Sequence, residues 1–159
     1  MKLETTRFGT LELDEQTIIT FTQPIIGFQD YRRFVILPGP AGGDLKWLQC
    51  TDEGGLAFIV MDPRLVLPDY AVSLKKSELL ELAVASPDEL EVYTLVVVPM
   101  DRTQIRTNLR APILLNPKLR LAKQAILDQS DYPVQYFLAQ ATEDANAPKQ
   151  EVSHARSDA

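Results

Sequence analysis

The residue types that most often carry covalent chemistry are scarce in this sequence. Cys50 is the single cysteine and His154 the single histidine. A cysteine nucleophile needs a base held beside it, and His154 lies in a polar C-terminal stretch that could hardly hold it there. Cys50 follows Trp47 and Leu48, and a cysteine in such an apolar run is far more often a small core residue. The pattern therefore argues against a cysteine enzyme.

Metal and phosphate sites also lack their usual motifs. One cysteine and one histidine cannot make a Cys/His zinc cluster. The glycine-rich stretch GPAGGD has neither the spacing of a phosphate-binding loop nor the Lys-Ser or Lys-Thr that completes one. The acidic pairs at 52–53 and 88–89 stand at expected turns, where carboxylates are usually just solvated. We therefore expect no enzyme activity and no cofactor.

The composition is that of a single small globular domain. The chain has 159 residues, of which 45% are hydrophobic, and its formal net charge of −6 disfavours direct nucleic-acid binding. No apolar run approaches the roughly 20 residues that span a bilayer, and the start MKLETTRFGT lacks the apolar block of a signal peptide. A lone cysteine suits a reducing compartment. We expect a cytoplasmic location, no membrane partner and a monomer.

The stretch from Ala141 to Ala159 ends the predicted domain. It contains one branched apolar residue, Val152, and no aromatic residue. Such a segment cannot bury enough apolar surface to order itself. We therefore expect one domain over residues 1–140 and a disordered tail over residues 141–159.

Charge is segregated along the chain. Residues 77–101 hold six carboxylates and no Lys or Arg, whereas residues 102–127 hold six Lys or Arg and no carboxylate. The two segments could complement each other within the fold, or at least one could face a charged partner. Under the second explanation the candidate partner contacts are the acidic residues Glu78, Glu81, Asp88, Glu89 and Glu91.

Short runs bounded by Gly, Pro or Asp predict a β-rich protein. Gly9 stands between two alternating segments and predicts a first hairpin. Strand-forming residues then recur in TIITF, RFVILP, LKWLQCT and LAFIVM, with turn residues between the runs. EVYTLVVVP is nearly all apolar and predicts a strand buried on both faces. Together these runs predict a curled antiparallel sheet or barrel.

The sequence predicts only modest helix. The best candidate is SLKKSELLELA, which Ser73 would cap and Pro87 would prevent from continuing. Its Glu78 would face water. A second, shorter helical turn is expected at GFQDYRR. The leucines of the first helix would face the core: Leu79, Leu80 and Leu82.

The stretch LLNPKLRLAKQAIL fits two structures. In a helix Asn116 would be the N-cap and Pro117 the first helical residue. In a hairpin the residues 116–119 would form a type I turn. Helix propensity favours the first, whereas the buried run 113–115 needs a partner strand for its backbone. The strand of the hairpin would point five side chains to one face: Leu119, Leu121, Lys123, Ala125 and Leu127.

Three segments together resemble a known family. They are TRFGTLELDEQTIITFTQPIIGFQDYRRFVILP (6–38), FIVMDPRLVLPDYAVSL (58–74) and NLRAPILLNPKLRLAKQAILDQSDYPVQYFL (108–138). In order and spacing they are similar to the FliW family of bacterial flagellar assembly factors, over about residues 2–138. The resemblance implies a mainly β, β-rich α+β fold, a small antiparallel pseudo-barrel capped by a short helix. It also favours the hairpin over the helix at 116–119.

The resemblance implies a function too. FliW proteins bind cytoplasmic flagellin, and they bind the RNA-binding translational repressor CsrA so that it releases its transcripts, that of flagellin among them. Flagellin and CsrA compete for FliW, which acts without catalysis. The alternative is a small regulatory or ligand-binding β-barrel without a flagellar client. Within the family motif the candidate protein-binding residues are Asn108, Ala111, Pro112 and Asn116, which could equally be turn and strand-edge formers.

Overall fold

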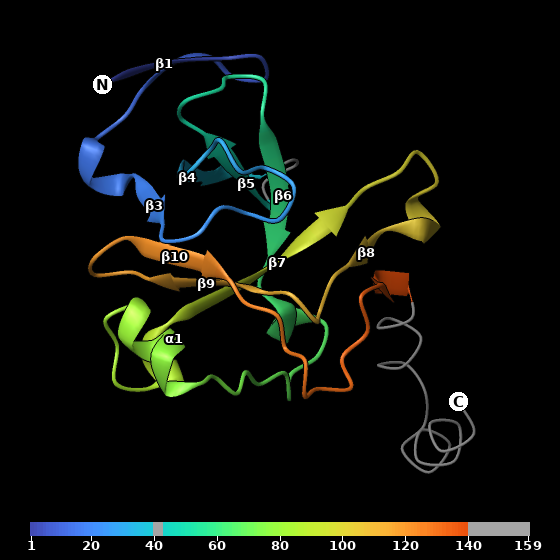
Figure 1. Ribbon diagram of the computed structural model, residues 1–159. Coiled ribbons are helices and arrows are strands. Elements are labelled where there is room, and N and C mark those ends of the chain that lie inside the picture. Colours follow the sequence, from blue (N-terminus) through green and yellow to red (C-terminus); the bar gives the residue numbers. More distant parts are fainter. Residues whose placement is uncertain (40–42, 140–159) are drawn as a thin grey trace.

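The computed structural model describes residues 1–39 and 43–139. The predicted disordered tail at 141–159, with His154, lies outside these residues. Figure 1 shows strands wrapped around a common interior and a short helix below one hairpin.

The regular secondary structure of the described chain consists mostly of short strands. The helix is α1 (Lys76–Glu81), and 3₁₀ turns lie at Glu15–Thr17, Pro63–Leu65, Pro87–Glu89 and Arg102–Gln104. The strands are β1 (Lys2–Thr5), β2 (Gly9–Glu12), β3 (Ile19–Phe21), β4 (Arg33–Pro38), β5 (Lys46–Cys50), β6 (Ala57–Met61), β7 (Glu91–Val97), β8 (Arg106–Thr107), β9 (Ile113–Asn116), β10 (Leu121–Gln124) and β11 (Tyr136–Phe137). The predicted runs at 17–21, 33–38, 45–51, 56–61 and 91–99 are thus all confirmed as strands.

Seven of these strands close into a barrel. Their order is β7-β6-β5-β4-β3-β10-β9, and β9 pairs back onto β7. Every pairing in this ring is antiparallel except that of β3 with β10, which is parallel. A closed ring of seven strands cannot alternate direction throughout. The predicted antiparallel barrel is therefore correct except at this one seam.

A short extension of the sheet projects beyond the barrel; we call it the arm, and it consists of the end of β7 together with β8 and β11. The end of β7 pairs with β8, and β8 pairs with β11. Figure 1 shows β7 and β8 running away from the barrel toward the upper right. At the far end Asp101 accepts hydrogen bonds from the Thr103 amide at 3.0 Å and its hydroxyl at 2.6 Å, which closes the turn of the arm.

The stretch at 113–124 is a hairpin. Leu121 of β10 stands opposite Asn116 of β9, and the Arg120 amide donates to the Asn116 carbonyl at 2.8 Å. The loop therefore covers residues 117–120, one residue further along the chain than the predicted turn at 116–119, and Arg120 closes it with a φ of 57°. Leu119 is exposed in this loop instead of lying on the predicted strand face.

Two apolar cores lie on either side of β9 and β10. The barrel interior holds Ile19, Phe21, Phe34, Leu48, Val60, Ile113, Leu115 and Ala122 among others. The second core lies outside the barrel and holds Tyr70, Leu82, Leu90, Val92, Leu109, Leu114, Ala125 and Leu127 among others, with Leu121 packed against it. Because strand side chains alternate, β9 and β10 contribute to both cores.

Helix α1 differs from its prediction. It starts after Lys75, so Ser73 is not its cap, and Glu78 accepts a hydrogen bond from the Lys75 amide. Leu82 is buried as expected, but Leu80 is 74% exposed. A helix of six residues has room for one narrow apolar stripe, and Leu80 lies off it. The prediction that Leu80 faces the core was wrong.

Two further predictions are corrected. The stretch 27–33 forms turns that lead into the first residue of β4 instead of a helical turn, and Gly27 has a φ of 89°, which interrupts a helix. Strand β7 is not buried on both faces throughout, because Val97 is about half exposed where the strand enters the arm. Its first half does contact both cores, through Val92 on one side and Tyr93 on the other.

Candidate protein-interaction surface

Asn116 connects the hairpin to the helix. Its side-chain amide donates to the Leu82 carbonyl at 2.9 Å, and its side-chain oxygen accepts from the amides of Lys118 at 3.0 Å and Leu119 at 3.2 Å. The residue is 4% exposed. Asn116 is therefore a fold-organising residue in this state, and its side chain is not presented to a partner.

The other three motif residues lie where the chain passes from the arm to the barrel. Asn108 accepts a hydrogen bond from the Arg110 amide at 2.9 Å, which closes a turn after β8. Ala111 and Pro112 are buried, and their carbonyls accept from the Gln124 side chain and the Ala125 amide respectively. This part of the motif thus holds β10 against the segment before β9. That it also contacts a partner stays a prediction.

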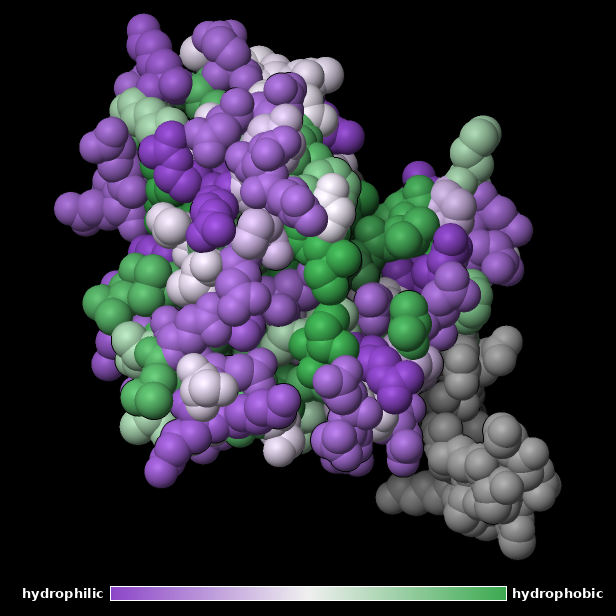
Figure 2. Space-filling view, in the orientation of Figure 1, coloured by the Kyte–Doolittle hydropathy of each residue, from purple (hydrophilic) through white to green (hydrophobic). Residues whose placement is uncertain are grey.

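Asn108 and Ala111 border a surface hollow, which we call the arm-foot hollow. Its volume is about 340 Å³, and its lining residues come from four separate parts of the chain. Figure 2 shows hydrophobic patches right of the centre, on the barrel side of the arm. The described residues that line the hollow are Ile26, Asn108, Arg110, Ala111, Gln124, Ile126 and Val134.

The acidic residues of α1 are used inside the fold. Lys123 on β10 is only 7% exposed, and its ammonium lies 3.0 Å from Glu81 and 3.7 Å from Glu78. Glu81 also accepts hydrogen bonds from Thr22 at 2.6 Å and Gln23 at 3.0 Å. Burial alone would raise the pKa of Glu81, but these hydrogen bonds and the Lys123 charge outweigh it and hold the pKa below its usual range.

The remaining acidic candidates surround the start of β7. Glu89 caps the preceding 3₁₀ turn, accepting from the amides of Ala85 at 2.8 Å and Ser86 at 3.0 Å. Glu91 accepts from the Tyr93 hydroxyl at 3.0 Å; burial first, and then this bond, raise the pKa of Tyr93 to about 12. Asp88 is exposed. The structure therefore does not gather the five acidic candidates into one unpaired patch.

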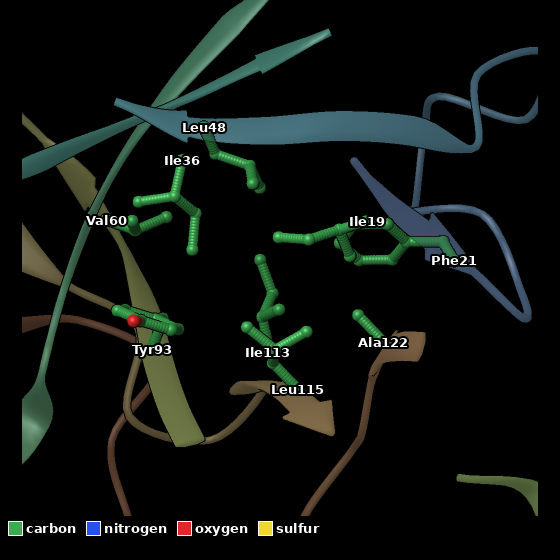
Figure 3. Close-up of a pocket in the computed structure, with 9 residues that line it drawn as sticks. All are labelled: Ile19, Phe21, Ile36, Leu48, Val60, Tyr93, Ile113, Leu115 and Ala122. Carbon is green, nitrogen blue, oxygen red and sulfur yellow. The ribbon is translucent and has the colours of Figure 1, made fainter. Parts of the chain in front are cut away.

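The barrel interior is filled by its own side chains. Figure 3 shows nine residues from β3 to β10 pointing toward a common centre, and the cavity left between them is about 10 Å³. That is about the volume a single water needs. Cys50 is buried as the sequence predicted, and burial raises the pKa of its thiol. Among the described residues no group of three or more His, Cys, Asp or Glu could hold a metal ion.

The sequence missed two features of this surface. Lys123 was placed on the same strand face as Leu121 and Ala125, which is compatible with its burial but does not identify α1 as its partner. The exposure of Ile126 follows from the same alternation, because its neighbours Ala125 and Leu127 face the second core. Nothing in the sequence, however, brings Ile126 together with residues near positions 26 and 134.

These features define a class of protein: a small closed β-barrel whose interior is filled by its own side chains. A crystal structure of the flagellar assembly factor FliW has this fold. The two match with a TM-score of 0.80 and 29% sequence identity over 87% of this chain and 96% of that chain.

The sequence comparisons agree with the fold. The model of the FliW protein family matches residues 2–138. The flagellar assembly factor FliW of Ruminiclostridium cellulolyticum is 36% identical over 87% of this chain and 94% of its own. That of Bdellovibrio bacteriovorus is 34% identical over 84% of this chain and 77% of its own. The chain belongs to the FliW family of flagellar assembly factors. Its described residues contain no helix long and apolar enough to cross a membrane.

Proposed function

We propose that this chain binds cytoplasmic flagellin and antagonises the translational repressor CsrA, so that CsrA releases the flagellin transcript. The observation that carries the proposal is the family match over residues 2–138, which spans the whole barrel. The protein works by binding, as a monomer in the cytoplasm, and flagellin and CsrA compete for it. Free flagellin thereby lowers its own synthesis.

The filled barrel supports a surface function over the alternative of a ligand-binding barrel. A drug-sized ligand needs a cavity of about 300 Å³ or more, whereas the interior offers about 10 Å³. Recognition must therefore take place on the outside of the barrel, where a protein partner can reach it.

The test is a reconstituted competition. CsrA is bound to a labelled RNA that carries the flagellin leader, and the purified chain is added with and without flagellin. We expect the chain to release the RNA and added flagellin to restore the CsrA–RNA complex. RNA that stays bound at saturating chain, together with no heat of binding to either protein in calorimetric titration, would contradict the proposal.

A further inference from the structure

Three apolar side chains converge on the arm-foot hollow although they are distant in sequence. Ile26 follows β3, Ile126 follows β10 and Val134 precedes β11, and they are 64%, 46% and 55% exposed. Single exposed apolar residues are ordinary, but a cluster around a hollow marks an interaction site. The cluster has an ordered frame, because the Gln124 side chain accepts from the Ile26 amide at 3.1 Å and donates to the Ala111 carbonyl at 3.3 Å.

The charge beside this hollow is positive and forms no ion pair with a described residue. Arg110 is the only ionisable side chain among the described residues that line the hollow. Within the part of the chain that the structure describes, no carboxylate lies within ion-pair distance of Arg102, Arg106 or Arg110. Arg110 and Arg106 donate to the carbonyls of Ser130 and Gln104, which are neutral acceptors.

The acidic segment does not neutralise these arginines. Glu78 and Glu81 are engaged by Lys123, and Glu89 caps a turn. Asp101, the one carboxylate between residues 98 and 127, accepts two hydrogen bonds from Thr103. Asp88, Glu89, Glu91 and Asp101 also lack an ion pair, but none of them lines the hollow, so Arg110 carries the only formal charge among the described residues that line it.

We propose that the arm-foot hollow is the docking site for flagellin, which fills it with an apolar segment that carries a carboxylate for Arg110. This assignment rests on the proposed function. A partner that fills the hollow must supply apolar side chains for its walls and a negative charge for Arg110 at its border. CsrA binds RNA and must present cations of its own, so the arginines repel it. CsrA therefore binds elsewhere on the barrel, and its competition with flagellin is indirect.

The test is a pair of double variants titrated against flagellin and against CsrA. Ile126→Ser with Val134→Ser removes apolar contacts of the hollow, and Leu65→Ser with Leu119→Ser removes similarly exposed side chains elsewhere. We expect the first pair to weaken flagellin binding about tenfold or more, as loss of central interface contacts does. CsrA binding, the melting temperature and the behaviour of the second pair should stay at wild-type values.

A third variant tests the charge. Arg110→Gln removes the positive charge and keeps a polar side chain, so flagellin binding should weaken and depend less on salt than in the wild type. Unchanged flagellin binding in both hollow variants, or an equal loss for CsrA, would overturn the docking assignment. A wild-type chain that bound neither partner would instead overturn the proposed function, and this assignment with it.

Discussion

Asn116 shows how a family motif residue can act through the fold. One side chain satisfies the last turn of α1 and two amides of the hairpin loop, so it joins two elements that are 34 residues apart. Truncating it leaves buried backbone groups without partners, which costs more than the bonds themselves contribute.

We predict that Asn116→Ala lowers the free energy of unfolding by about 2–3 kcal/mol. Urea denaturation of the two proteins measures the difference. Lys118→Ala, at an exposed position of the same loop, is the control and should change stability little. A loss of partner binding by Asn116→Ala at full stability would show instead that Asn116 contacts the partner directly.

The lowered pKa of Glu81 predicts that the stability of the fold depends on pH. Its pKa is lowered in the folded protein from an ordinary value of 4.5, so the folded state holds a proton there less tightly than the unfolded state. The contribution of Glu81 is therefore complete above that ordinary value and is lost as the pH falls through the folded value. Glu81→Gln should melt lower than the wild type at pH 7, and the gap should narrow in acid. Melting curves across this range measure it, with Asp88→Asn as the exposed control.

Leu82, the residue that follows α1, anchors the helix in the second core, whereas Leu80 does not contribute to this packing. Leu82 is completely buried in the second core, whereas Leu80 points to solvent. We predict that Leu82→Ala destabilises the protein by about 2–5 kcal/mol, and that Leu80→Ser changes stability by less than about 0.5 kcal/mol. Denaturant unfolding of the pair tests this. Similar losses for both variants would show that Leu80 faces the core after all.

The acidic segment at 77–101 could either stabilise the fold through internal contacts or steer CsrA, and a charge reversal distinguishes these two roles. Because Glu78, Glu81 and Glu89 all have partners within the fold, reversing them to Lys should lower the melting temperature by several degrees. Binding of flagellin and CsrA should then weaken together. If the segment steers CsrA instead, CsrA binding alone should weaken, through slower association at low salt, with the melting temperature unchanged.

A second triple variant controls for net charge. Asp69→Lys, Asp88→Lys and Asp128→Lys change the total charge by the same amount at exposed positions. Its melting temperature should stay close to that of the wild type. A loss equal to that of the first triple variant would mean that overall charge, and not the contacts of Glu78 and Glu81 with Lys123, determines the stability.

Local patterns in the sequence were sufficient for most of the strands. RFVILP coincides with β4 because β-branched and aromatic residues between turn formers have few other stable structures. The hairpin of β9 and β10 is different, because Leu119 in its loop and Lys123 and Gln124 in β10 favour helix. The hairpin forms because β10 also pairs with β3 and β9 with β7. Family resemblance, not propensity, predicted that outcome.

The sequence by itself determined the strand-rich domain, the buried Cys50 and the family, because these depend on residues close together in the chain or in a fixed order. The tertiary structure decided which charges pair and which apolar side chains stay exposed. Closure of the barrel places Lys123 against α1 and Ile126 beside Val134 and Ile26, which is 100 residues away from Ile126 in the chain. Burial and charge pairing are properties of such contacts, and no local pattern specifies them.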